Sequence, residues 1–346
     1  MKVTEKIAVL RNLMQQDGID YYFPTNDFHG SEYVADYFKC REYMSGFTGS
    51  AGSLLVSATE AGLWTDGRYF LQAEAQLAGS GITLYRMGEP GVPKIFEYIA
   101  QHIQPGQCLG FDGRMVDAFY ALQLKKIVES KGARLVTEFD LVGAVWYNRP
   151  WLEAKPAYSL STQYTGVERG EKLDAICKWL DTRKADMLVI TSLDDIAWAL
   201  NIRGEDIHCC PVVLSYLVIK PLERILFANK SAFSTRLRQE LARDSVLLRE
   251  YDEIYDYLAA VPAGSRVVMD MHVANYQLVN SVPQNSKIVN AVCPTKMMKA
   301  VKISPAFYMN VLSRWAQRMK NRIILSDCMS LGMNFQNPSS IHIGRS

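Results

Sequence analysis

The stretch Ser45-Gly46-Phe47-Thr48-Gly49-Ser50-Ala51-Gly52 decides the fold of the first half of the chain, and it leads into the apolar run Leu54-Leu55-Val56. Its three glycines permit positive φ and close backbone approach, which a tight entry into a central strand requires. Farther along, Asp66-Gly67 lies between apolar runs and predicts a hairpin turn. No Gly-Lys-Ser/Thr follows the glycines, so a phosphate-binding loop is disfavoured. We expect a small-residue loop, a buried strand, a turn and a second strand.

Length and composition are those of an ordinary globular protein with two domains. The 346 residues are 49% hydrophobic and 21% charged, with a net charge of +2, which gives no reason to expect nucleic acid or an anionic membrane as a partner. The longest nearly apolar run, Cys209 to Ile219, is about half of the ~20 residues that span a bilayer. The N-terminus has the pattern of an amphipathic helix and not of a signal peptide. Seven cysteines without a Cys-x-x-Cys pair favour reduced thiols and a cytoplasmic location.

An internal repeat sets the architecture. The strand-like run Tyr21–Phe23 follows an amphipathic helix pattern, and Met187–Ile190 follows another. The helix pattern Ile95–Ile99 has its counterpart in Ile254–Leu258, so the period is about 160 residues, the size of a whole domain. Each half alternates strands with helices, and the hairpin signal at Asp66-Gly67 argues against an all-parallel sheet. We therefore expect two tandem α/β domains of one fold.

Several helix ends carry capping signals. We expect the first helix to begin at Thr4 and to stop at Asp17-Gly18. Thr165-x-x-Glu168 has the spacing of a capping box for the corresponding helix of the second half. Asp194 is expected to cap a helix that begins at Asp195, and Gly204 to end it with positive φ.

The predicted boundaries follow from prolines and from a change of composition. The first domain is expected over 1–150 and the second over 157–302, joined by a linker near Asn148–Pro156, where two prolines bracket an extended segment. After Lys302, residues 303–346 hold one acid and five bases: Asp327, Arg314, Arg318, Lys320, Arg322 and Arg345. This short, irregular tail is too small to bury a core of its own.

Three local groups raise the question of chemistry. Asp195 and Asp206 have a spacing found in some metal sites, but they fall on either side of a helix end, and we interpret them as structural. His208-Cys209-Cys210 is compatible with a thiolate nucleophile or a soft-metal site, but buried, inert cysteines are the favoured interpretation. His29 lies in a polar loop that follows the first strand. A histidine there faces either a binding cleft or, as we favour, solvent or a hydrogen-bond partner.

Two signatures resemble the aminopeptidase P family, the Xaa-Pro aminopeptidases of the creatinase-like metallopeptidases. The first is Ser45–Gly52 followed by Trp64-Thr65-Asp66-Gly67-Arg68-Tyr69, and the second is Leu193–Ile207. The linker Trp146-x-x-Arg149-Pro150 fits the same pattern, and the match ends at the lysine-rich stretch Lys296–Lys302. The resemblance implies two creatinase N-terminal-like domains, each a mixed β-sheet flanked by helices.

The resemblance also implies a function, together with a missing part. Intact members remove an N-terminal residue that precedes proline from short peptides, using two metal ions, usually manganese, in a catalytic "pita-bread" domain. That domain would begin after Lys302, where the acid-poor tail stands instead, as a frameshift or an early stop would produce. No catalytic or metal-binding residue, and no cofactor, is therefore expected in this chain.

The two domains that remain would serve substrate gating and oligomer assembly, as they do in intact relatives. By resemblance, the candidates for gating are His29, Arg68, Arg203 and Asp206. The expected partners are a second copy of the chain, as in a homodimer, or a full-length homologue. The alternative interpretation is a non-catalytic peptide-binding or assembly module. A Cys-dependent hydrolase is a third and less favoured possibility.

Overall fold

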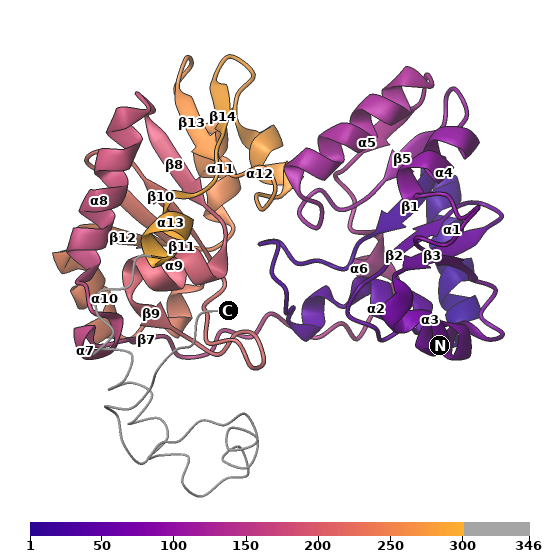
Figure 1. The fold of residues 1–346 in the computed structure, drawn as a ribbon, viewed down its shortest axis with the longest axis horizontal. Helices are drawn as coiled ribbons and strands as arrows, with labels where there is room; N and C mark the ends of the chain where they lie inside the picture. Colours follow the sequence, from indigo (N-terminus) through magenta and orange to yellow (C-terminus); the bar gives the residue numbers. More distant parts are fainter. Residues whose placement is uncertain (301–346) are drawn as a thin grey trace, which may run out of the picture.

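The computed structural model describes residues 1–300, which form two α/β domains side by side (Figure 1). The first contains a six-stranded sheet in the order β4-β3-β2-β1-β5-β6. Its strands are β1 (Ile19–Phe23), β2 (Ser53–Val56), β3 (Ala61–Thr65), β4 (Thr83–Arg86), β5 (Cys108–Gly110) and β6 (Arg134–Val136). Its helices are α1 (Val3–Asp17), α2 (Cys40–Ser45), α3 (Phe70–Leu77), α4 (Ile95–His102), α5 (Ala118–Ser130) and α6 (Leu141–Val145).

The second domain repeats this plan, strand for strand. Its sheet has the order β12-β11-β10-β8-β13-β14. The strands are β8 (Met187–Ile190), β10 (Ser215–Ile219), β11 (Arg224–Ala228), β12 (Val246–Arg249), β13 (Arg266–Met269) and β14 (Lys287–Asn290). The helices are α7 (Thr162–Thr165), α8 (Arg169–Thr182), α9 (Leu193–Leu200), α10 (Thr235–Arg243), α11 (Glu253–Ala259), α12 (Tyr276–Ser281) and α13 (Pro294–Ala300). A two-stranded sheet of β7 (Tyr158–Ser159) and β9 (Ile202–Arg203) lies beside them. The predicted pair of α/β domains is confirmed.

Each sheet is mixed, with helices on both of its faces. In the first, β1 pairs antiparallel with β2 and parallel with β5. One face is covered by α1, whose Leu10 has no exposed surface, and the other by α5, whose Leu124 is equally buried. In the second domain, α8 covers one face of the sheet with Leu173, and α12 covers the other with Leu278. Burial of apolar area on both faces, at about 25 cal/mol per Å², is the main stabilising contribution in each domain.

The hairpin lies at a different place from the one predicted. The turn between the antiparallel strands β2 and β3 is at Ser57–Glu60, where Ser57 N donates to Glu60 O at 2.8 Å. Asp66 instead caps a 3₁₀-helix over Gly67–Tyr69, and its carboxylate accepts from Arg68 N at 3.1 Å. The prediction of a turn at Asp66-Gly67 was wrong, because an aspartate before a glycine serves as a helix cap equally well.

The glycines of the deciding stretch have different roles. Gly46 has the positive φ that the sequence allowed, 74°, and ends α2, a helix that was not predicted. A Cβ on Gly49 would lie 2.2 Å from Phe47 Cζ, and one on Gly52 would lie 3.2 Å from Trp64 O. These two positions therefore require glycine for close approach and not for positive φ.

Replacing Gly49 with alanine is therefore expected to destabilise the first domain by about 1–3 kcal/mol, because the buried Phe47 ring must move to admit a methyl group. The urea midpoint of the full chain, followed by circular dichroism, measures this change. Gly67 is a matched control for added side-chain volume, since its φ is not positive and the nearest atom to its Cβ position is Phe70 Cε2 at 3.8 Å. A Gly49→Ala variant as stable as the wild type would contradict the role given to this close contact.

Two predicted caps of the long helices were displaced. The N-cap of α1 is Lys2, and Thr4 lies within the first turn. The N-cap of α8 is Glu168, whereas Thr165 ends the short helix α7. Thr165 is therefore not part of a capping box. The sequence pattern gave no sign of the four-residue helix α7 before α8. Helix ends are the least certain part of such a prediction.

The ends of α9 also differ from the prediction. Ser192 is the N-cap, Asp194 lies in the first turn, and Asn201 ends the helix in the left-handed conformation with φ of 51°. Gly204 serves close packing instead, because a Cβ there would lie 2.6 Å from Val213 Cγ2. Glycine tolerates the left-handed conformation best, and asparagine is the next most tolerant residue.

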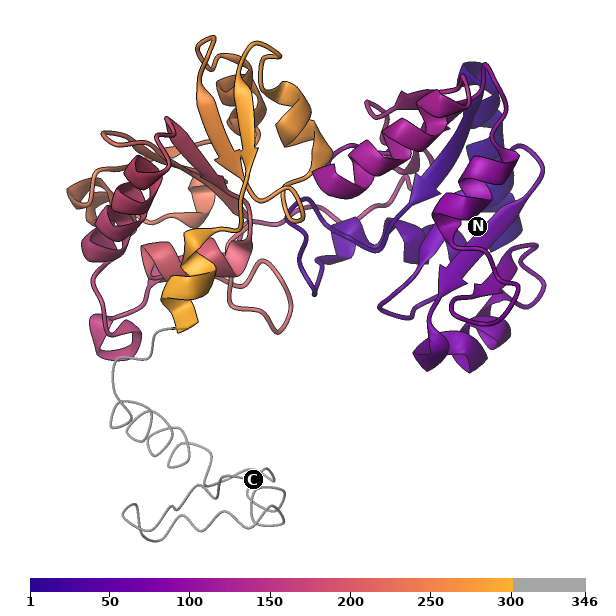
Figure 2. The ribbon, with the colours of Figure 1, turned by 45° about the horizontal axis from the view of Figure 1, so that its top comes forward.

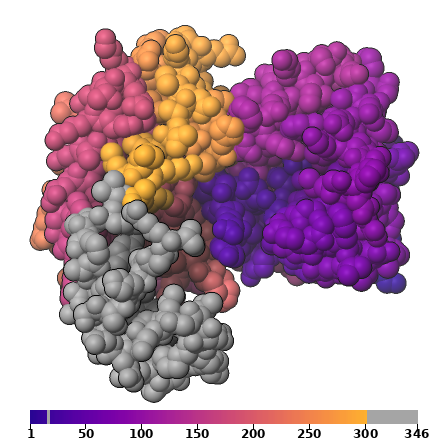
Figure 3. Space-filling model, in the orientation of Figure 1, coloured from indigo at the N-terminus to yellow at the C-terminus, as the bar shows by residue number. Residues whose placement is uncertain are grey.

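The junction between the domains is built from equivalent segments of the repeat. Ala118 N donates to Ala274 O at 2.8 Å, and Tyr276 N donates to Val116 O at 2.8 Å. Asp117 and Asn275 form the antiparallel bridge between them. The N-terminal ends of α5 and α12 thus meet about a local two-fold axis (Figures 1 and 2). In the space-filling view, the domains are two lobes that touch along this upper edge (Figure 3).

The predicted boundaries at 150, 157 and 302 stay predictions. The first sheet ends at Val136 and the second begins at Met187, so the linker prediction falls between them. The tail predicted over 303–346 lies outside the described residues.

Candidate functional site

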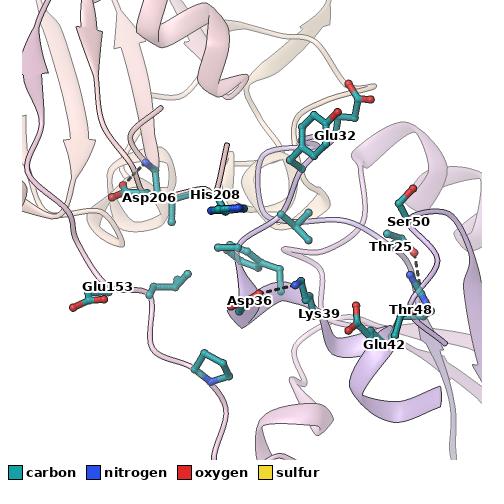
Figure 4. A pocket seen from close by; sticks show the side chains of 18 of the residues that line it. Thr25, Glu32, Asp36, Lys39, Glu42, Thr48, Ser50, Glu153, Asp206 and His208 are labelled. Carbon is teal, nitrogen blue, oxygen red and sulfur yellow. Dashed lines mark hydrogen bonds and ion pairs between the residues drawn. The ribbon is translucent and has the colours of Figure 1, made fainter. Parts of the chain in front are cut away.

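A cleft of about 1050 Å³ lies between the two domains, below their junction. The first domain contributes the segment after β1, part of α2, and residues 48–50 of the glycine-rich stretch. The linker and the segment after β9 form the rest of the wall (Figure 4). Its charged or titratable lining residues are Glu32, Asp36, Lys39, Arg41, Glu42, Glu153, Lys155, Asp206 and His208. A cleft at a domain interface is a usual place for ligand binding.

Arg41 makes the first-domain wall rigid. Its Nε donates to Thr25 Oγ1 at 3.0 Å, its Nη2 donates to Gly49 O at 2.5 Å, and its Nη1 donates to Phe47 O. The side chain is buried, and burial lowers the pKa of its guanidinium to about 10, so it stays charged at neutral pH. The family-like stretch is therefore held in place by the Arg41 side chain.

Asp206 ties the second domain to the linker. Its Oδ1 accepts from Lys155 N at 3.0 Å and its Oδ2 accepts from Leu214 N at 2.8 Å. Burial raises the pKa of this carboxyl group, although the two backbone hydrogen bonds oppose the rise. Both oxygens thus serve to position backbone.

On the opposite wall, Asp36 and Lys39 form an exposed ion pair at 2.6 Å. Trp151 projects from the linker with 92% of its surface exposed. Neither the pair nor this tryptophan was singled out in the sequence, although Pro150 and Pro156 mark the extended linker that presents Trp151.

Of the four candidates for gating, the cleft contains one, Asp206. Arg68 is exposed and pairs with Asp66, at 2.8 Å from Nε and from Nη2. Arg203 donates from Nη1 to Ala197 O and Ile202 O at 2.8 Å each, and burial lowers its pKa.

His29 lies in neither cleft nor solvent. It is buried in the domain junction, where Nδ1 lies 3.0 Å from Thr191 O and Nε2 lies 2.6 Å from Tyr251 Oη. The hydrogen-bonded alternative of the sequence interpretation is the one observed, but its partners belong to the other domain.

The aspartates with metal-like spacing have separate roles. Asp195 has no exposed surface and lies 2.5 Å from Lys299 Nζ, which also contacts Asp194. This ion pair joins α13 to α9. Across residues 1–300, no three His, Cys, Asp or Glu side chains come together as a metal site. The described residues therefore do not fit a di-nuclear centre.

The adjacent cysteines are less buried than predicted. Cys209 is exposed, with φ of 60°, at a turn in which Cys210 N donates to Ile207 O at 3.1 Å. Cys210 is half-buried, and burial raises the pKa of its thiol. The prediction of burial was wrong for Cys209. A raised thiol pKa disfavours the thiolate that a nucleophile requires.

Comparison with known proteins identifies the family. Creatinase/prolidase N-terminal domain models match residues 6–139 and 148–304. Aminopeptidase P2 of Arabidopsis thaliana is 35% identical over 286 residues, which are 81% of this chain and 40% of that protein. The chain belongs to the aminopeptidase P family. A probable Xaa-Pro aminopeptidase P of Coprinopsis cinerea is 37% identical over 75% of this chain and 42% of its own length.

A solved structure of this family extends the likeness to both domains together. The X-prolyl aminopeptidase of Caenorhabditis elegans, described as a cytosolic enzyme with a di-nuclear active site, is 29% identical with a TM-score of 0.81. The match covers 87% of this chain and 52% of that protein. The chain thus spans about half the length of the aminopeptidases it matches. Among residues 1–300, no helix is both long and apolar enough to cross a membrane.

Proposed function

We propose that this chain acts as the N-terminal two-domain region of an Xaa-Pro aminopeptidase, a metal-dependent enzyme that removes an N-terminal residue that precedes proline. The observation that carries the proposal is the likeness to the Caenorhabditis elegans enzyme, which includes both domains in the same order and arrangement. By this proposal, the substrates of the complete enzyme are short proline-containing peptides and its location is the cytoplasm.

The described residues would support catalysis without performing it. Two manganese ions are the expected requirement of the longer relatives, and residues 1–300 offer no group of ligands for them. No step of peptide hydrolysis is therefore assigned to these side chains. Their proposed contribution is to limit access: the cleft stands beside the junction, and Asp206 fixes the linker that closes one of its sides.

The direct test is hydrolysis of a short Xaa-Pro-Xaa peptide by the purified chain, with manganese and with chelator. We expect no turnover in either condition, because the ligands of a di-nuclear site do not come together in residues 1–300. Intact mass measurement excludes a contaminating full-length enzyme. Metal-dependent turnover would contradict the proposal, and Asp195 and Asp206 would then be the first residues to replace.

Assembly is the second candidate function, either as a homo-oligomer or by pairing with a full-length homologue. It is favoured by the partial coverage of the relatives, since the match spans only 40% of the length of aminopeptidase P2. Size-exclusion chromatography with light scattering, alone and mixed with an intact homologue, tests it. A chain that stays monomeric in both cases would count against assembly.

A further inference from the structure

The segment after β1 faces two ways. Asp27, Phe28 and His29 are buried at the domain junction, whereas Glu32 to Ala35, only a few residues later, line the cleft. Asp27 produces the reversal, since its Oδ1 accepts from His29 N at 2.8 Å and from Ser31 N at 2.9 Å. The contacts that hold His29 in the junction therefore also position residues 32–35 in the wall of the cleft.

The contacts of His29 determine where its proton is. Thr191 O is a carbonyl and only accepts, so Nδ1 carries the hydrogen. In a neutral ring Nε2 then accepts from the Tyr251 hydroxyl, and in a protonated ring it would donate to the same oxygen. The ring packs against Tyr216, with centroids 4.5 Å apart, and against Tyr251 at 5.7 Å. The contacts thus place one hydrogen on Nδ1, and the buried surroundings favour a neutral ring with Nε2 unprotonated.

Most groups around His29 are neutral and would stabilise a protonated imidazole only weakly. Its own segment supplies Asp27, whose Oδ2 is buried without a hydrogen-bond partner. β10 supplies Tyr216, and the loop before α11 supplies Tyr251. Behind them lie Tyr255 of α11 and the neutral amide of Asn275 at the start of α12. Farther out, Arg114 lies over the Phe28 ring at 4.6 Å, Cys210 lies beyond Asp27, and the segment from Thr191 presents a carbonyl.

The balance of these effects favours the neutral form. Burial lowers the pKa of His29, and the nearby Asp27 and the Thr191 carbonyl only partly oppose this. Protonation would place a hydrogen on Nε2, where the ring now accepts from Tyr251, and would leave a cation without water between tyrosine rings. Removing water from a charged group is unfavourable unless full pairing replaces it.

We propose that His29 is a proton-operated latch, which in its neutral form holds residues 26–35 against the second domain and releases this wall of the cleft when it is protonated. The latch belongs to residues 1–300 and does not depend on the proposed peptidase role. Its partners, Thr191 and Tyr251, both lie in the second domain, so release loosens the contact between the domains at this edge.

The direction of the pH effect follows from linkage. A histidine whose pKa is lowered in the latched state takes up its proton more readily in the released state. The latch is therefore fully stable above the ordinary histidine pKa of about 6.5 and weakens as the pH falls below it. The equilibrium constant for release of the latch rises by up to tenfold for each unit by which burial lowers the pKa of His29, and reaches this limit only below both pKa values.

Hydrogen exchange of the full chain at pH 7.5 and pH 5.5, corrected for the intrinsic pH dependence of exchange, tests the latch. We expect amides in residues 26–35 to exchange faster at pH 5.5, by up to about tenfold, because this pH lies one unit below the ordinary histidine pKa, while the β1 amides keep their protection. A His29→Gln variant retains a polar amide but takes up no proton, and is expected to lose this pH response. His208→Gln, which changes an exposed histidine of the cleft, is the matched control and should retain it.

Equal pH responses in the wild type and in His29→Gln, or no response in the wild type, would overturn the proposal. If His29→Gln does not fold, Tyr251→Phe keeps the ring and removes the hydroxyl that His29 accepts from. The latch then predicts faster exchange of residues 26–35 already at pH 7.5. Exchange like that of the wild type at both pH values would again overturn it.

Discussion

Replacing Arg41 with methionine is expected to lower the free energy of unfolding by about 3–5 kcal/mol, because it removes three charge-assisted hydrogen bonds from a buried site. Methionine has a similar length and fills much of the space, so cavity formation contributes little. The cost comes from the carbonyls of Phe47 and Gly49, which lose their buried donor. Urea unfolding followed by circular dichroism measures it.

Arg68→Met is the matched control for Arg41→Met. Arg68 carries the same charge and pairs with Asp66, but both side chains are exposed and the ion pair is open to solvent. We expect the unfolding midpoint of this variant to equal that of the wild type. If the two variants were equally destabilised, the loss would be a matter of net charge, and the role of Arg41 in holding the deciding stretch would be refuted.

The repeated architecture was predictable because its determinants are periodic and local. Apolar runs such as Met187–Ile190 and Leu54–Val56 became buried strands, and the helix pattern at Ile95–Ile99 became α4. The positions of turns and caps were less predictable. Asp66-Gly67 and Asp194 each have two acceptable local conformations, and the choice between them is made by contacts from elsewhere in the chain, such as that of Lys299 with Asp194.

The cleft was not predictable from the sequence, because its walls come from three distant parts of the chain. Asp36 and Lys39, Trp151, and Asp206 share no motif and come together only through the packing of the two domains. His29 illustrates the same limit. A histidine in a polar loop is compatible with solvent, and only the second domain, through Thr191 and Tyr251, explains why this one is buried.

Asn275 joins a helix cap to a contact across the domain junction, and its replacement by alanine is expected to lower the free energy of unfolding by about 2–4 kcal/mol. Its Oδ1 accepts from Leu278 N at 3.0 Å and so caps α12. Its Nδ2 donates to Phe28 O at 2.8 Å, across the junction, and to Tyr216 Oη at 3.3 Å. The alanine variant therefore loses a helix cap and also leaves a buried carbonyl of the first domain unpaired.

The local two-fold symmetry supplies the controls for Asn275→Ala. Asp117 is the equivalent cap, on α5, and accepts from Tyr120 N at 2.9 Å; Asp117→Ala should cost only the cap, about 1 kcal/mol. Asn275→Ser keeps a capping oxygen, but its side chain is too short to reach Phe28 O. This variant therefore removes only the contact between the domains.

Denaturant unfolding of these three variants distinguishes cap from junction. If the junction couples the domains, Asn275→Ser should broaden the transition or split it in two, because each domain then unfolds by itself. Asp117→Ala should leave a single transition with a lower midpoint. A single, unshifted transition for Asn275→Ser would mean that the backbone pairing of Ala118 with Ala274 and of Tyr276 with Val116 suffices to join the domains.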